Sequence, residues 1–200
     1  MTPRMMQHRF DESVKVEARG MPRVVEFLRN RPNTIDVLPA TDTQQREQDI
    51  DLVWLRNKHT SQFSKDVYET TVEVKVDAQG HRTGNLFFEM VSNELYCTTG
   101  CFMMTEATLF IYYFVESGEL LLMKVEDVRN WYGNQLSTRP HTRDGGQRFQ
   151  PVYLENRVGD NYYTTFGRLV PREEILAGLG VGNKIHQFFL DGAPTQRNIV

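Results

Sequence analysis

Alternation of apolar and polar residues predicts β-strands in the middle of the chain. In Thr71–Asp77, three valines face one way and three charged side chains face the other. Asp49–Leu55 alternates in the same manner, with Asp49 and Asp51 on its polar face. A short strand is also expected at Thr34–Leu38. The two alternating segments predict strands with one face toward the core and the other toward polar surroundings.

Two later segments are apolar on both faces. Leu86–Val91 is interrupted by a single charged residue, Glu89, and Leu109–Val115 has no charged residue. Continuous apolar runs are typical of strands buried in the centre of a sheet. A turn at Glu116–Glu119 allows Leu120–Val125 to pair back against the preceding strand. These segments predict a sheet of roughly five strands.

Helices are predicted on either side of this sheet. Gly20 and Pro22 break the early chain, and Pro22–Asn30 starts with a proline suited to the first helical position and carries a broad apolar face. Shorter helices are expected at Glu126–Tyr132, Pro171–Leu179 and Lys184–Leu190, and residues 133–150 are expected to form a polar loop. The predicted fold class is therefore α/β (α+β), a central mixed sheet flanked by helices in a single domain.

Composition and charge narrow the classes of function. The 200 residues include 23 Lys and Arg against 26 Asp and Glu, a net charge of −3. This charge argues against a protein that coats nucleic acid without specificity, but local basic patches remain compatible with it. The longest apolar run is far below the ~20 residues that a membrane helix needs, and residues 1–10 lack the apolar stretch of a secretion signal. We therefore expect a cytoplasmic protein with no membrane partner.

The two cysteines, Cys97 and Cys101, are too few for a disulfide scaffold. Their spacing also lacks the second pair of ligands that a structural zinc site needs. We predict two reduced thiols.

The charged residues of the predicted strands are the best candidates for chemistry. Glu73 and Lys75 are two residues apart on one strand, so their side chains share a face. Asp51 has the same place in the alternation of the preceding strand, and Glu89 lies in an otherwise apolar one. A buried carboxylate costs several kcal/mol unless it is paired or coordinates a cation. Several carboxylates beside one lysine are better explained by a divalent metal than by a single ion pair.

This arrangement resembles the PD-(D/E)xK nuclease superfamily, in which an acidic residue on one strand precedes a (D/E)-x-K motif on the adjoining strand. Asp51 supplies the first element and Glu73-Val74-Lys75 the second, while Ile50 stands where the family motif has proline. The segment Thr83–Glu89 resembles the third core strand of phage and bacterial members. The resemblance implies a restriction-endonuclease-like core at about residues 22–130, followed by a helical and loop extension at about 131–200.

The resemblance also implies roles for individual residues. Asp51 and Glu73, with the carbonyl of Val74, would hold one or two Mg²⁺ or Mn²⁺ ions, and Lys75 would position water or neutralise developing charge. Glu89 or Asp49 would support the ligands or bind a second metal, although Asp49 also fits a solvated turn residue. Many members carry an acidic residue in the first helix, for which Glu26 is the natural candidate and Glu17 or Glu12 the alternatives if the helix begins earlier.

The resemblance implies phosphodiester hydrolysis, with DNA as the expected substrate. The loop at residues 137–150 carries Arg139, Arg143 and Arg148, which could contact phosphates. A homodimer is a further expectation, because nucleases that cut both strands often dimerise. The alternatives are a catalytically inactive nuclease-like module that binds nucleic acid or a partner protein, for instance as an inhibitor, and an RNA-directed enzyme on the same scaffold.

Overall fold

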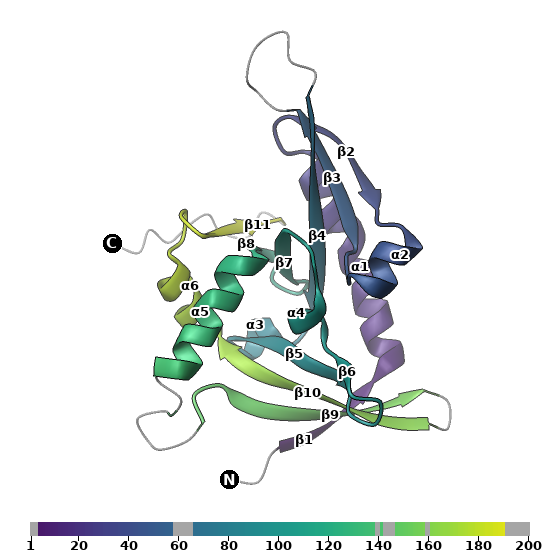
Figure 1. Cartoon of the computed structure of the whole chain (residues 1–200), viewed down its shortest axis with the longest axis vertical. Coiled ribbons are helices and arrows are strands. Elements are labelled where there is room, and N and C mark those ends of the chain that lie inside the picture. Colours follow the sequence, from purple (N-terminus) through teal and green to yellow (C-terminus); the bar gives the residue numbers. More distant parts are fainter. Residues whose placement is uncertain (1–3, 58–65, 139–140, 142–146, 159–160, 191–200) are drawn as a thin grey trace.

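The computed structural model describes residues 4–57, 66–138, 141, 147–158 and 161–190, which form two β-sheets with helices around them (Figure 1). The larger sheet has six strands in the order β11-β8-β7-β4-β3-β2. Its members are β2 (Thr34–Pro39), β3 (Leu52–Asn57), β4 (Val67–Asp77), β7 (Leu109–Phe114), β8 (Glu119–Lys124) and β11 (Ile185–Phe189).

Strand β4 lies inside this sheet and joins its two halves. It pairs antiparallel with β3, Leu52 lying opposite Val72, and parallel with β7, Val72 lying opposite Leu109. The sheet is therefore mixed, and helices flank it, which confirms the predicted α/β (α+β) class.

The second sheet was not predicted. Its five strands lie in the order β1-β9-β10-β5-β6, with the parallel pair β1–β9 at one edge. The strands are β1 (Arg4–Arg9), β5 (Asn85–Asn93), β6 (Thr98–Thr99), β9 (Gln150–Val158) and β10 (Asn161–Pro171). The expectation of a helical and loop extension after residue 130 is wrong, because β9, β10 and β11 all come from that part of the chain.

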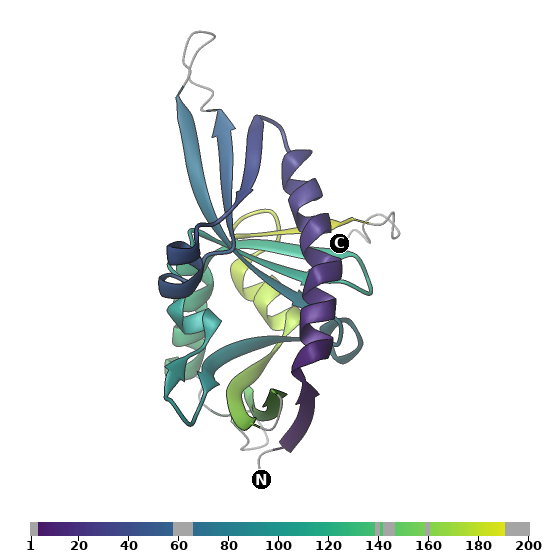
Figure 2. The same ribbon diagram turned by 90° about the vertical axis from the view of Figure 1, so that its right-hand side faces the viewer.

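The longest helix, α1 (Phe10–Arg29), runs beside both sheets (Figure 2). The prediction that Gly20 and Pro22 break the chain is wrong. A Cβ at Gly20 would lie 2.3 Å from Cγ1 of Val76, so glycine lets the helix approach β4 closely. Pro22 has no backbone N–H, so one helix carbonyl lacks its usual partner. Pro22 lies on the exposed side of the helix, where water can reach that carbonyl.

The remaining helices are shorter. They are α2 (Asp42–Glu47), α3 (Gly80–Thr83), α4 (Cys101–Met104), α5 (Val125–Thr138) and α6 (Arg172–Leu179). The helix expected at Lys184–Leu190 is wrong, because Ile185–Phe189 forms β11 and pairs antiparallel with β8. None of the helices in the described part of the chain is both long enough and apolar enough to cross a membrane.

Strand β7 separates two hydrophobic cores, which explains why it is apolar on both faces. Leu109, Ile111 and Tyr113 face the core beneath α1. Phe110, Tyr112 and Phe114 face the core that contains α4, α5 and part of β5. The charged face of β4 is turned toward this second core, so Glu73 is buried rather than solvated.

Candidate functional site

Asp51 is held against the middle of β4. It immediately precedes β3, where its backbone N–H donates to the carbonyl of Val72 at 3.0 Å. Its carboxylate Oδ2 accepts from the backbone N–H of Val74 at 2.8 Å. Asp51 therefore lies beside Glu73, as the resemblance implied, and the two carboxyl groups hydrogen bond to each other.

Asp49 joins this pair from a turn rather than from a strand. Its backbone has a left-handed conformation with φ of 52°, which aspartate adopts more readily than most residues. The hydroxyl of Thr105 donates to the Asp49 carbonyl at 2.7 Å and fixes the turn against the segment after α4. The turn thus carries the Asp49 side chain to the same site as Glu73.

Two carboxylate oxygens in this group have no hydrogen-bond partner. They are Oδ2 of Asp49 and Oε2 of Glu73, and both atoms are buried. Glu73 is only 5% exposed, so water does not compensate for the missing partner. The arrangement leaves buried acceptors of the kind that a cation or a proton satisfies.

The pKa values of the three carboxyl groups are all raised. Burial is the main cause for Glu73, and the charges of Asp51 and Asp49 add to it, raising its pKa to about 11. Burial also raises the pKa of Asp51 to about 6, although the N–H of Val74 and the hydrogen bond with Glu73 act in the opposite direction. The pKa of Asp49 is raised by burial and by the charge of Glu89. Without a cation, at least one proton is therefore held among these carboxylates at neutral pH.

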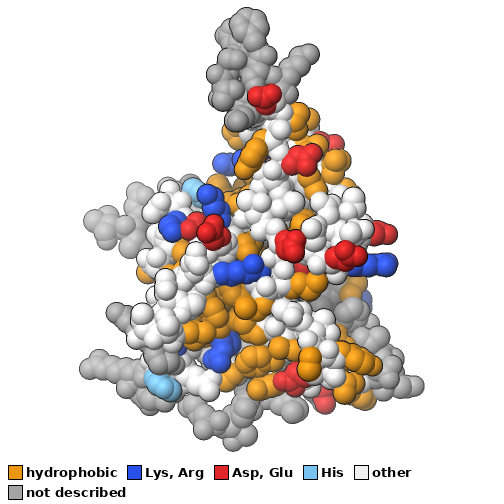
Figure 3. Space-filling model, viewed as in Figure 1, with side chains coloured by type: hydrophobic (Ala, Val, Ile, Leu, Met, Phe, Trp, Pro, Cys, Tyr) orange, Lys and Arg blue, Asp and Glu red, His pale blue; other side chains and the backbone are white. Residues whose placement is uncertain are grey.

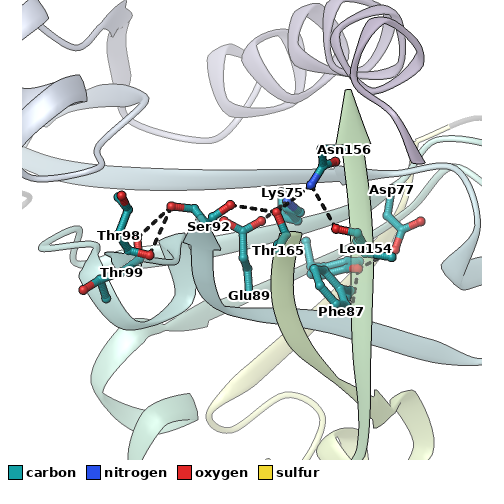
Figure 4. Close-up of polar contacts among 11 residues, drawn as sticks. Lys75, Asp77, Phe87, Glu89, Ser92, Thr98, Thr99, Leu154, Asn156 and Thr165 are labelled. Atoms are coloured by element: carbon teal, nitrogen blue, oxygen red, sulfur yellow. Dashed lines mark hydrogen bonds and ion pairs between the residues drawn. The ribbon is translucent and has the colours of Figure 1, made fainter. Parts of the chain in front are cut away.

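Lys75 and Glu89 form an ion pair across the two sheets, with Nζ and Oε2 3.6 Å apart (Figure 4). Burial lowers the pKa of Lys75, but Cys101, Glu89 and Glu73 together outweigh burial and raise it. Lys75 is thus a permanent cation beside the carboxylates. Thr83–Glu89 was expected to form a strand next to β4. Instead, β7 is the strand beside β4, and Glu89 lies on β5, which belongs to the second sheet.

Gly100 fixes the position of Glu89. Its N–H donates to the carbonyl of Met90 at 2.9 Å, and a Cβ at this position would lie 2.7 Å from the backbone carbon and oxygen of Glu89. Backbone atoms cannot yield as a flexible side-chain end can, so only glycine fits here.

We expect Gly100→Ala to lower the free energy of unfolding by roughly 1–3 kcal/mol, because it overpacks this contact. The matched control is Gly133→Ala within α5, where a Cβ would meet no atom within 4 Å. That change should raise stability by up to about 1 kcal/mol through helix propensity. Urea unfolding measures both, and equal effects of the two changes would contradict the close approach at Gly100.

Glu26, the acidic residue of the first helix that was the natural candidate for the site, is not the one that influences Asp51. Glu26 lies on an exposed part of α1, in a surface hollow that it shares with Met21 and Arg29. The α1 residue whose charge raises the pKa of Asp51 is Glu17, one of the two alternatives. Glu26 is about 13 Å further along the helix at 1.5 Å per residue.

The predicted phosphate-contacting arginines are only partly described. Arg139 and Arg143 lie outside the described residues. Arg148 forms an ion pair with Glu174 of α6, and its guanidinium lies over the ring of Phe149 at 5.4 Å. On the face shown in Figure 3, the described Lys and Arg side chains stand apart rather than forming one continuous stripe.

Cys101, for which the sequence predicts only a reduced thiol, lies in the same site. Both cysteines are free, but Cys97 is exposed whereas Cys101 is partly buried at the start of α4. Nothing in the sequence around Cys101 indicates this position, because it depends on the packing of α4 on β5 and on the contact of Thr105 with the Asp49 turn. Glu17 could have been found, since Val16, Gly20, Val24 and Leu28 repeat every four residues and predict a helix that begins before Pro22.

Comparison of the chain with protein-family models, with curated proteins and with solved structures gives no match. The functional interpretation therefore depends on the geometry of the site.

Proposed function

We propose that the protein is a metal-dependent nuclease that hydrolyses phosphodiester bonds, acting as a DNA endonuclease. The observation that carries the proposal is the group formed by Asp49, Asp51 and Glu73, with two buried oxygens that lack a hydrogen-bond partner. Lys75 lies beside this group as a cation. Carboxylates around a divalent cation, next to a fixed positive charge, suit metal-assisted hydrolysis of a phosphodiester.

The residues fit a divalent cation such as Mg²⁺ or Mn²⁺. Asp51 and Glu73 would hold it with the carbonyl of Val74, as the resemblance implies, and Asp49, whose carboxylate converges with that of Glu73, would add a third carboxylate. The orphaned oxygens of Asp49 and Glu73 are the acceptors that it would satisfy. When bound, the ion would lower the pKa of a coordinated water and offset charge on the scissile phosphate.

The protein's own groups have distinct parts in this proposal. Lys75 stays protonated, so it is suited to stabilise charge on a phosphate oxygen and not to act as a general base. Glu89 is a positioning residue that orients Lys75 through their ion pair. The N–H of Val74 fixes the carboxylate of Asp51 beside Glu73. The predicted homodimer and cytoplasmic location remain predictions.

Cleavage of nucleic acid by the purified chain tests the proposal. Supercoiled plasmid, single-stranded DNA, branched DNA and matched RNA oligonucleotides are incubated with Mg²⁺ or Mn²⁺, and EDTA provides the metal-free control. We expect cleavage of DNA that Asp51→Asn reduces by at least about a hundredfold. Asp42→Asn, at an exposed position in the first turn of α2, should leave the rate unchanged.

Three outcomes separate the candidate functions. Cleavage of RNA alone would favour the RNA-directed enzyme. Absence of cleavage on every substrate, together with no stabilisation by either metal, would favour the catalytically inactive binding module. Equal activity of Asp51→Asn and wild type would refute the proposed site.

A further inference from the structure

We propose that Cys101 is a metal ligand in this site, acting with Asp49 and Glu73, and that the site therefore takes a sulfur-binding divalent cation such as Zn²⁺ in preference to Mg²⁺. The inference rests on the proposed metal site and specifies which ion it holds. It adds a ligand that the nuclease resemblance does not imply.

The ligand atoms already converge. The Sγ of Cys101 and one carboxylate oxygen each from Asp49 and Glu73 all lie within 4.8 Å of one another. Zinc binds sulfur at about 2.3 Å and carboxylate oxygen at about 2.0–2.2 Å, so neighbouring ligands in its tetrahedral arrangement are roughly 3.4–3.7 Å apart. Side-chain rotations that bring these atoms up to about an ångström closer together would place all three around one ion.

An independent observation concerns two of the same side chains. Glu73 is 5% exposed, and its Oε2 atom has no hydrogen bond, as is also true of Oδ2 of Asp49. Glu73 and Asp49 are the two carboxylate side chains whose ligand atoms converge with the sulfur of Cys101. A cation at this point would satisfy the orphaned acceptors and use the sulfur at the same time.

The position of Cys101 is fixed by the residues on either side of it. Gly100 packs against the backbone of Glu89, and Phe102 stacks on Phe88 with ring centroids 4.0 Å apart. Arg129 of α5 donates to the carbonyls of Phe102 and Thr105, at 2.9 and 2.8 Å.

The segment that fixes Cys101 also fixes the carboxylate-bearing turn at Asp49. The hydroxyl of Thr105 donates to the carbonyl of Asp49, so the segment that places Cys101 also places the Asp49 turn. The thiol and the carboxylate are therefore held in a fixed relation by the protein, as ligands of one ion must be.

The donor set determines the preferred ion. Mg²⁺ binds oxygen ligands in a strict octahedral arrangement and retains several waters, so a thiolate is a poor ligand for it. Zinc and related transition metals accept sulfur, nitrogen and oxygen together. One sulfur with two carboxylate oxygens therefore favours Zn²⁺, Co²⁺ or Cd²⁺ over Mg²⁺.

Titration of the full chain with Co²⁺ and Cd²⁺ tests the ligand directly, because metal–thiolate bonds give charge-transfer absorption that oxygen ligands do not. We expect this absorption to saturate at one ion per chain in wild type and in Cys97→Ser, the exposed matched control. Cys101→Ser and Cys101→Ala should lack the absorption and bind Zn²⁺ more weakly by at least about tenfold. Circular dichroism of both variants shows whether they are folded.

The outcomes distinguish this inference from the proposed function. Charge-transfer absorption that persists in folded Cys101→Ser, or that wild type never shows, overturns the role of Cys101. If Cys101 proves not to be a ligand but Mg²⁺-dependent DNA cleavage is observed, the nuclease proposal is retained. Thiolate binding that depends on Cys101, without cleavage under any metal, supports the ligand and refutes the nuclease.

Discussion

Under the proposed nuclease function, replacing Lys75 with methionine is expected to slow DNA cleavage by about a hundred- to a thousandfold while leaving the fold intact. Methionine keeps most of the length of the side chain and removes its charge. Since Lys75 remains protonated beside Glu89, the substitution removes a positive charge that we propose acts on the phosphate, and it does not remove a proton acceptor. The loss should therefore fall mainly on kcat rather than on KM.

Single-turnover cleavage by Lys75→Met, Lys75→Arg and wild type measures this effect. The arginine variant keeps the charge and should retain more activity than the methionine variant. Lys184→Met is the matched control, because Lys184 forms a comparable ion pair with Asp127 at 2.7 Å on the surface. Loss of activity in the control equal to that in Lys75→Met would contradict a specific role for Lys75.

Glu73→Gln is expected to stabilise the metal-free protein and to abolish its stabilisation by metal. Folding raises the pKa of Glu73 from 4.5 to about 11, so the folded state holds a proton that the unfolded state releases. This contribution to stability is fully present below about pH 4.5 and is lost as the pH rises toward the folded value. Glutamine needs no proton, and we expect it to raise the free energy of unfolding by roughly 1–3 kcal/mol near pH 8.

Thermal unfolding of Glu73→Gln and wild type, with and without Mn²⁺ or Zn²⁺, measures both effects. The gain in the free energy of unfolding from glutamine should grow between pH 6 and pH 8 and nearly vanish below pH 5. This direction follows because the raised pKa of Glu73 destabilises the wild type as the pH rises. Metal should stabilise wild type more at pH 8 than at pH 6, because protons on Asp51 and Glu73 compete with it.

Glu69→Gln is the matched control for this prediction, since Glu69 lies on the same strand and is exposed. It should change stability by less than about 0.5 kcal/mol at every pH. A metal-induced stabilisation of Glu73→Gln equal to that of wild type would rule out Glu73 as a ligand.

The alternating strands were predictable because a strand places successive side chains on opposite faces. Val72, Val74 and Val76 therefore lie toward α1, and Glu73 and Lys75 share the other face of β4. The helix start was predicted wrongly because Gly20 and Pro22 were interpreted by propensity alone. At Gly20, close packing on Val76 outweighs the low helix propensity of glycine. Pro22 is tolerated within the helix because it lies on the exposed side.

The C-terminal strands β9, β10 and β11 were missed for a related reason. Strand β9 pairs with β1 from the far end of the chain, and β10 pairs with β5. Those two pairings join distant segments and have no local signal, whereas the antiparallel pairing of β9 with β10, in which Asn161 lies opposite Val158, joins neighbouring segments and does have one. Lys184–Leu190 carries a short apolar run that fits a helix or a strand equally, and its pairing with β8 decides the outcome.

The sequence by itself determined the mixed class of the fold, because it contains both strand-like and helix-like segments. It also determined the two faces of β4 and the neighbouring positions of Glu73 and Lys75, because both follow from the period of a single strand. Tertiary structure alone decided that Asp51 lies against Val74, that Glu89 reaches Lys75 from a second sheet, and that Cys101 lies beside Glu73. These contacts depend on strand register and on the packing of α4, which are set by interactions between segments far apart in the chain and leave no pattern within any one of them.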